Sequence, residues 1–223
     1  MKTYDAIVFD KDMEFADDLF FSGETTVNGS LKGFSFNFEK DLEVKSSLEA
    51  TRGAIISASA VKIGKDMISV SDITIKGKCE VAGKITGGNI TFTGNLVTAN
   101  AIIGETVQIR GKITVKNGIF ASKAIQIDLN PRRYPVNINN TIQAPKIVLF
   151  FRGFYTKWYK VPTAMLGLLR RKRRMKKVIK IEDLSISTEK LVIQTFYSPE
   201  SVEVQYINSA IDAKETELVA VSL

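Results

Sequence analysis

Residues 73–127 read ITIKGKCEVAGKITGGNITFTGNLVTANAIIGETVQIRGKITVKNGIFASKAIQI, and this stretch decides the fold because it repeats itself. A phrase of alternating apolar and polar residues that ends in glycine begins at Ile73, again at Ile90 and again at Val107. The shift is 17 residues each time (73 to 90 to 107). A constant period of this length predicts a solenoid, in which each repeat forms one coil and gains its core by stacking on the next.

Three faces per coil are the simplest geometry for this repeat, because its apolar residues recur at steps of six, six and five. The positions are Ile73, Cys79 and Ile85, then Ile90, Leu96 and Ile102, then Val107, Ile113 and Ile119. Around each position the alternation is that of a short β-strand with one side facing inward. Glycines fall between these strands, where the chain must bend. Equivalent residues of successive coils should form buried ladders, namely Ile73, Ile90 and Val107, and Ile85, Ile102 and Ile119.

The alternation continues on both sides of this central repeat, so the solenoid should span most of the chain. If about 195 residues are coiled at 17 per coil, the rod has roughly 11 coils and is roughly 50 Å long, because strands of neighbouring coils lie about 4.8 Å apart. An antiparallel sandwich is the alternative, since its strands also alternate and its turns also hold glycine. The constant spacing argues against it. The sequence therefore predicts an all-β fold, a parallel β-helix.

The composition limits the chemistry that this chain can perform. It has no histidine, which removes Ser-His-Asp and Cys-His nucleophile pairs, imidazole bases and zinc sites with histidine ligands. Asp and Glu concentrate in the first fifty residues, without a spacing that assembles an acid pair. We therefore predict no catalytic residue, no cofactor, no metal site and no small-molecule substrate. An enzyme that processes polysaccharide with surface carboxylates ranks third among the functions considered.

The expected compartment is the cytoplasm. Cys79 is the only cysteine, so the chain has no internal disulfide framework. The N-terminus MKTYDAIVFDKD carries acids where a secretory signal would need an apolar run. No stretch approaches the ~20 uninterrupted apolar residues of a membrane-spanning helix, which leaves peripheral attachment as the way to meet a membrane.

Charge is unevenly spread along the chain. The net charge is +7, but residues 150–180 hold eleven Lys and Arg and no Asp or Glu, so the rest sums to −4 (7 − 11). The strand alternation stops at Leu149 and returns near Val178. We therefore divide the chain into an acidic N-terminal segment or cap (1–24), the β-helix (25–149), a basic aromatic insertion of loop and helix (150–177), and a continuation of the β-helix (178–223).

The insertion has the composition of an interfacial membrane anchor, because aromatic rings sit at headgroup depth while cations meet anionic lipid. Nucleic acid is the alternative partner, with cations on phosphates and rings on unpaired bases. A solvated helix, or a contact with an acidic surface of a neighbouring subunit, is the third interpretation. The candidate membrane- or polyanion-binding residues are Phe150, Phe151, Arg152, Phe154, Tyr155, Lys157, Trp158, Tyr159, Lys160, Leu168, Leu169, Arg170, Arg171, Lys172, Arg173, Arg174, Lys176 and Lys177.

The C-terminal residues predict a polymerisation end. Each end of a solenoid exposes unpaired backbone groups, and natural monomers protect such edges with a helix, a loop or charges. Here the chain closes on an apolar strand with no cap behind it. The alternative is that this strand pairs only into its own last coil. The candidate polymerisation residues are Leu218, Val219, Ala220, Val221 and Leu223.

Two segments resemble the bactofilins, polymer-forming cytoskeletal proteins of bacteria with relatives elsewhere: GKCEVAGKITGGNITFTGNLVTANAIIGETVQIRGKITVKNGIFASKAIQI and the earlier DLEVKSSLEA. The resemblance covers about residues 40–128 and rests on short V-x-G-x-I-x-A-x-x-V-x-I phrases. It implies a right-handed β-helix that assembles end to end without nucleotide and often lies on the inner membrane face. The chain departs from the family in two ways. Its coils continue beyond the usual end, and it carries a basic insertion where the family attaches through a short N-terminal tail.

A left-handed hexapeptide helix is the competing solenoid, since a six-residue step also suits it. Enzymes of that class use histidine as a base or as a zinc ligand, and this chain has none. The sequence thus predicts a structural scaffold that forms a homopolymer end to end and attaches, through the basic insertion, to the cytoplasmic face of the cell membrane. A nucleic-acid-binding adaptor that uses the same insertion is the alternative function.

Overall fold

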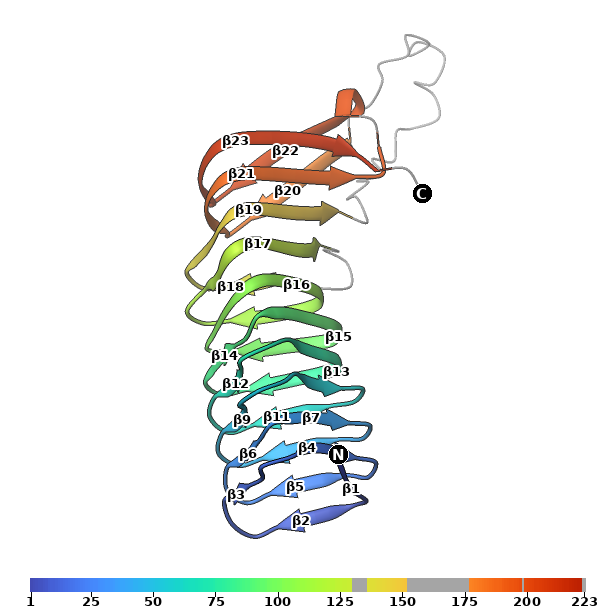
Figure 1. Cartoon of the computed structure of the whole chain (residues 1–223). Helices are drawn as coiled ribbons and strands as arrows, with labels where there is room; N and C mark the ends of the chain where they lie inside the picture. Colours follow the sequence, from blue (N-terminus) through green and yellow to red (C-terminus); the bar gives the residue numbers. More distant parts are fainter. Residues whose placement is uncertain (130–135, 152–176, 198, 222–223) are drawn as a thin grey trace, which may run out of the picture.

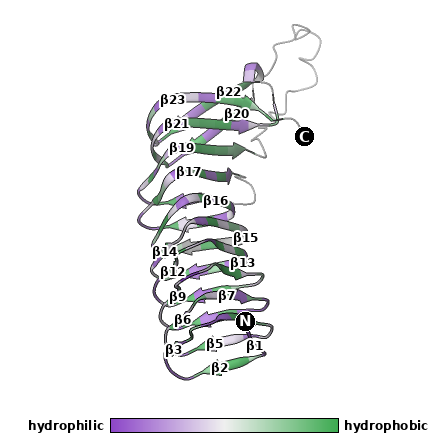
Figure 2. Ribbon diagram, in the orientation of Figure 1, coloured by the Kyte–Doolittle hydropathy of each residue, from purple (hydrophilic) through white to green (hydrophobic). Residues whose placement is uncertain are grey.

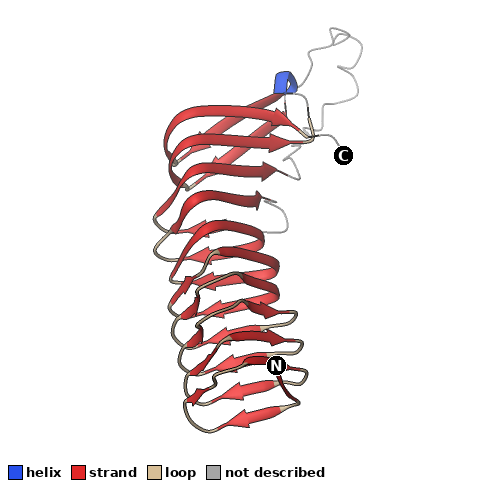
Figure 3. Cartoon of the chain, in the orientation of Figure 1, coloured by secondary structure: helices blue, strands red, loops and turns tan. Residues whose placement is uncertain are grey.

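The chain forms a rod of stacked β-coils in the computed structural model, which describes residues 1–129, 136–151, 177–197 and 199–221. Figure 1 shows the coils rising from the N-terminal end to the C-terminal end, and Figure 3 shows that they consist almost entirely of strands. Each strand pairs in parallel with its equivalent in the next coil. The predicted all-β parallel β-helix is confirmed, whereas its handedness stays a prediction.

Three faces follow one another around each coil. The first twelve strands and β14 each occupy one face. On the first face these are β1 (Lys2–Tyr4), β4 (Asp18–Phe21), β7 (Ser35–Phe38) and β10 (Ile55–Ser57); on the second, β2 (Ile7–Phe9), β5 (Thr25–Val27), β8 (Leu42–Val44) and β11 (Val61–Ile63); on the third, β3 (Met13–Glu14), β6 (Leu31–Gly33), β9 (Leu48–Ala50), β12 (Met67–Ser69) and β14 (Lys84–Thr86).

Most of the later strands are longer and bend from one face to the next. They are β13 (Ile73–Val81), β15 (Asn89–Ala99), β16 (Ala101–Val115), β17 (Ile119–Leu129), β18 (Val136–Ile138), β19 (Thr141–Phe151), β20 (Lys177–Glu182), β21 (Ser185–Thr195), β22 (Val202–Ile207) and β23 (Ala210–Ala220), with a short 3-10 helix η2 (Pro199–Ser201) before β22. Strands β20 and β22 pair with each other in a separate two-stranded sheet. The described residues place eleven successive segments on the first face, in agreement with the roughly 11 coils predicted.

Both predicted ladders are confirmed by the strand register. Ile90 pairs with the residues 17 before and 17 after it, and Ile102 does the same in the second ladder. The expected place of Leu96 is wrong, because Val97 pairs with Cys79 and Ile113 instead. The corner after Thr93 holds one residue more than the corners below and above it, so the pairing of the following strand moves by one.

The core fills the interior of the rod with aliphatic side chains on all three faces, and Figure 2 shows hydrophobic positions recurring along the strands. In the lowest coils the filling is aromatic, with Phe21 stacked between Tyr4 and Phe38 at centroid distances of 5.4 and 4.9 Å. Cys79 is buried in the middle of the rod, and burial raises the pKa of its thiol to about 12. The ladder residues are thus packing residues, as predicted.

The rod has a regular region, residues 2–115, and an irregular region, residues 119–221. On the first face, paired positions are 17 to 19 residues apart through the regular region, then 22, 44 and 25 apart higher up. The expected N-terminal cap at 1–24 is wrong, because β1, β2 and β3 are the first coil and pair with β4, β5 and β6. In the part of the chain that the structure describes, no helix is long and apolar enough to span a bilayer.

Candidate assembly ends

The C-terminal end of the rod is an open strand edge. Strand β23 pairs with β21 at ten positions, from Ala210 to Ala220, and β22 pairs with β20. Among the described residues, no strand pairs with the outer edge of β22 or β23. The Val221 N–H donates to the Thr195 carbonyl at 2.8 Å, so the alternation of a parallel ladder directs the neighbouring Ala220 N–H to the open side. This edge can accept a further strand.

The predicted polymerisation residues lie on this last strand. Leu218, Val219 and Val221 are half-buried and Ala220 is exposed, while Leu223 lies outside the described residues. The strand does pair into its own last coil, which was the alternative interpretation. That pairing uses only one of its two edges. A role in a joint stays a prediction for the edge that remains.

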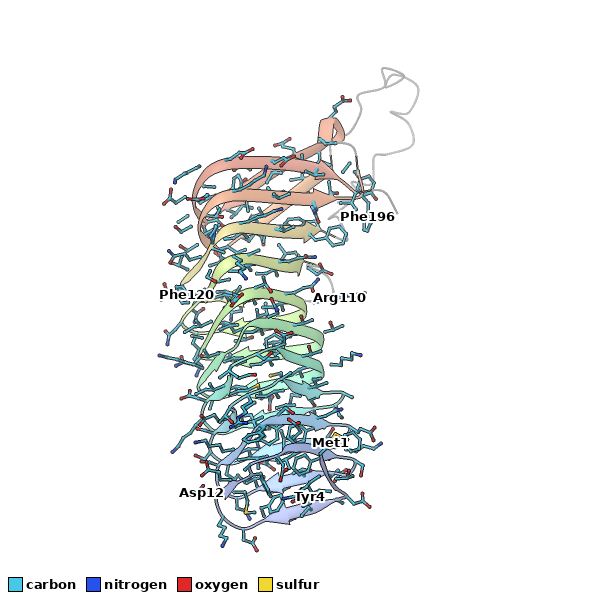
Figure 4. All side chains as sticks on the ribbon, in the orientation of Figure 1. Met1, Tyr4, Asp12, Arg110, Phe120 and Phe196 are labelled. Carbon is cyan, nitrogen blue, oxygen red and sulfur yellow. The ribbon has the colours of Figure 1, made fainter. Side chains whose placement is uncertain are left out.

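The N-terminal end is a second open edge with a different shape. It consists of three strands of two or three residues each, β1, β2 and β3. Within this first coil, the rings of Tyr4, Phe9 and Phe15 form a half-buried cluster with centroid distances of 5.7 to 6.0 Å. Figure 4 shows Tyr4 in the lowest coil. Sequence reasoning missed this end because it assigned these residues to a cap, although Ile7, Val8 and Phe9 are all residue types that favour strands.

Both ends are acidic. The first coil, residues 1–17, has two Lys and five Asp or Glu, a net −3 (2 − 5). The last coil, residues 199–221, has one Lys and five Asp or Glu, a net −4 (1 − 5). Ion pairs offset part of this charge, as Lys2 lies 2.7 Å from Asp17 and lowers the pKa of that carboxyl. At the other end, the ammonium of Lys190, which lies in the coil below, is 2.9 Å from the carboxylate of Glu217.

Several carboxylates outside the ends serve the corners of the coils. Asp41 accepts hydrogen bonds from the Ser59 hydroxyl and the Ala60 N–H of the next coil, and these bonds lower the pKa of its carboxyl. Asp66 accepts the Lys84 N–H at 2.7 Å in the same manner. Each such group satisfies a backbone donor that a bend leaves without a ladder partner. These acids therefore stack coils together and do not converge on a common site.

The predicted insertion begins later than expected. Strand β19 continues to Phe151, and Phe150 and Phe151 are only 8% and 3% exposed. The Phe150 ring meets Phe196 edge to face at 5.1 Å. Their assignment to the membrane-binding surface is wrong because both rings are buried, Phe151 in the core of the rod and Phe150 against Phe196. Lys177 is the first residue of β20, and the candidate residues from Arg152 to Lys176 lie outside the described residues.

One shallow hollow lies at the corner between the third and first faces in the irregular region. Its volume is about 560 Å³, and Ile103, Phe120 and Pro145 line its apolar part. Glu189 and Lys214 at its rim pair with each other at 3.3 Å. In the described ranges, no group of His, Cys, Asp or Glu is arranged to hold a metal ion. The hollow offers no nucleophile with an adjacent base.

In comparisons with protein families, curated proteins and solved structures, the chain matches none. The function is therefore argued from the rod itself, its two open ends and its charged edges.

Proposed function

We propose that this protein is a structural scaffold that assembles end to end into filaments and attaches to an anionic membrane surface through its basic segment. The observation that carries the proposal is the open outer edge of β23, a strand of eleven residues. A row of unpaired backbone groups is a template for another strand. The resemblance of residues 40–128 to polymer-forming bactofilins points to the same function.

Assembly is favoured by the same stacking of coils that holds the rod together. Each coil gains its core only from its neighbours, so a terminal coil has one unsatisfied side. Ile211, Ala213 and Leu218 are half-buried at the upper end and pack against the core that lies below them. A further coil from a second molecule would cover them and pair the β23 edge at the same spacing of about 4.8 Å.

The lower end offers a matching surface. Tyr4, Ile7, Phe9, Met13 and Phe15 are half-buried residues that pack against the core from one side only. Burying an apolar side chain contributes about 1.5 to 3 kcal/mol when its exposure is removed completely, so covering several half-exposed rings stabilises a joint appreciably. Burial of these apolar side chains at both ends therefore favours associated rods over separate rods in solution.

Attachment rests on the basic segment. Residues 152–176 contain nine Arg and Lys and no acid, and they connect β19 to β20 in the sequence. A cation near an anionic bilayer contributes about 1 kcal/mol, and the attraction falls off within a Debye length. Because every subunit of a filament brings one such segment, avidity would strengthen the attachment of the polymer over that of a single rod.

The test of assembly changes the open edge alone. In Ala220→Pro the N–H that faces outward is lost, whereas the hydrogen bond from the Val221 N–H to Thr195 is left in place. We expect electron microscopy to show filaments for the wild type and short single rods for the variant, with equal circular dichroism. Ala220→Thr keeps the N–H and should still form filaments. Monodisperse short rods of the wild type in all salt conditions would rule the proposal out.

The test of attachment uses vesicles. Replacing Arg170–Arg174 by serine or glutamine should abolish flotation of the full chain with vesicles that contain anionic lipid and leave filament formation intact. Binding to nucleic acid with a steep salt dependence, and no binding to vesicles, would favour the adaptor function instead.

A further inference from the structure

In three coils at the middle of the rod, the corner between the first and second faces is built from glycine. Gly77, Gly94 and Gly111 lie there in successive coils. A Cβ on Gly94 would lie 1.8 Å from the Gly77 carbonyl oxygen, and one on Gly111 would lie 2.1 Å from that of Gly94. We call this corner the glycine edge. Because no side chain can project from these three positions, it is a smooth ridge of backbone.

Cations flank the glycine edge on both sides. Lys76 and Lys78 stand next to Gly77, and Arg110 and Lys112 stand next to Gly111. All four side chains are exposed. The strand register aligns Lys76 with Arg110 through Thr93, and Lys78 with Lys112 through the backbone of residue 96. Two coils separate the pairs, a distance of about 9.6 Å along the axis.

Acidic groups offset part of this charge. Glu80 lies 2.7 Å from Lys78, and Asp128 lies 3.9 Å from Arg110. The Asp128 side chain is only 7% exposed, so it presents little charge to a surface outside. Lys76 and Lys112 remain at the surface beside the ridge. The glycine edge is therefore basic on its outer side, whereas the same corner of the lower coils carries the exposed acids Asp5, Glu24, Glu39 and Asp41.

The corner between the third and first faces carries acidic side chains. Here Asp72 accepts the Asn89 N–H at 3.1 Å, and Glu105 pairs with Lys123. Figure 4 shows Arg110 on the side of the rod where β19 ends, and Phe120 on the other side. Strand β19 ends at Phe151 at that same first-to-second-face corner, and residues 152–176 follow it in the sequence. The basic edge and the point of attachment thus share one side.

We propose that the rod meets an anionic lipid bilayer at the glycine edge, with Lys76, Lys78, Arg110 and Lys112 against the headgroups. This inference rests on the proposed attachment and adds the face that meets the membrane. A straight convex ridge fits a plane, whereas reading duplex DNA requires an element that enters a groove. The ridge also lacks the aromatic side chains on which unpaired bases stack.

The experiment compares two triple variants of the full chain on vesicles of phosphatidylcholine with about one third phosphatidylserine, at about 0.1 M NaCl. The first is Lys76→Ser, Arg110→Ser and Lys112→Ser. The matched control is Lys65→Ser, Lys84→Ser and Lys116→Ser, which removes the same charge from exposed positions at the corner between the second and third faces. Circular dichroism confirms that both fold.

We expect the first variant to bind these vesicles about a hundredfold more weakly than the wild type, since each cation near the surface contributes about fivefold. The control should lose less than about threefold. Equal losses would mean that binding follows net charge alone and would overturn the inference. The inference would also be overturned if the first variant bound as the wild type does while the Arg170–Arg174 substitution abolished binding. In that case the proposed attachment through the basic segment would still stand. A wild type that binds duplex DNA and no vesicle would overturn both.

Discussion

The regular and irregular regions of the rod share one ladder but differ in their corners. In the middle coils of the regular region, the corner between the first and second faces holds a glycine pressed against the carbonyl of the coil below, as at Gly94 and Gly111. In the irregular region β19 and β21 pair at ten positions in one constant register, although their partners are 44 residues apart in sequence. The pairing of strands therefore defines the solenoid, and the sequence period records only how long the corners are.

The two kinds of corner differ for a steric reason. At Gly94 and Gly111, backbone approaches the backbone of the coil below so closely that a side chain does not fit, although the corner at Gly94 holds one residue more than the corners next to it. Higher up, the register skips residues 121–123 at the corner after Phe120, and exposed Ser122 lies there. Such a corner can absorb insertions without disturbing the ladder.

The largest effect should come from adding one methyl group at the tight corner. Gly94→Ala places a Cβ 1.8 Å from the Gly77 carbonyl oxygen, and neither backbone can move without breaking the ladder. We expect a loss of about 3 kcal/mol in the free energy of unfolding, measured by urea denaturation and circular dichroism. Ser122→Val is the matched change in the irregular region and should stay within about 0.5 kcal/mol. Equal effects of the two variants would contradict the distinction between the regions.

The ladder and the faces could be predicted because alternation survives wherever a strand is buried on one side. Ile73, Ile90 and Val107 pair as the spacing indicated. The pairing partner of Leu96 could not be predicted. One extra residue in the corner moves the register of the strand that follows, while each strand by itself keeps the same alternation of apolar and polar residues. A change of register by one residue exchanges the two sides of a strand, so the structure alone decides it.

The boundaries of the ends and of the insertion were harder to predict, because composition gives no sharp limit. Phe150 and Phe151 begin an aromatic and basic stretch in sequence, yet both belong to the ladder of β17 and β19 and both are buried. Residues 1–24 appeared separate because they are acidic, but their acids point outward from coils that are otherwise ordinary. Charged residues therefore predict which side of a coil faces outward, but they do not predict where the first coil begins.

A smaller difference between two variants should distinguish the middle of the rod from its upper end. Ile90 is 1% exposed and has neighbours in the coils below and above, so Ile90→Ala should cost about 3 kcal/mol. Leu218 has a coil on one side only and is half-buried, so Leu218→Ala should cost about 1 kcal/mol in the unassembled protein. Urea unfolding at low protein concentration measures both. In filaments the cost of Leu218→Ala should rise if the upper end is a joint.

The smallest effect follows from what the two ends have in common. Because the first coil carries −3 and the last carries −4, any joint between ends brings like charges together. Raising NaCl from about 0.05 to 0.5 M shortens the Debye length to about 4 Å, so the critical concentration for assembly should fall by up to about tenfold in light-scattering measurements. Glu200→Gln with Glu203→Gln removes two exposed charges from the last coil and should assemble at low salt with a weaker salt dependence. Assembly that weakens as salt rises would show that opposite charges hold the joint, with basic residues of one molecule on the acidic end of another.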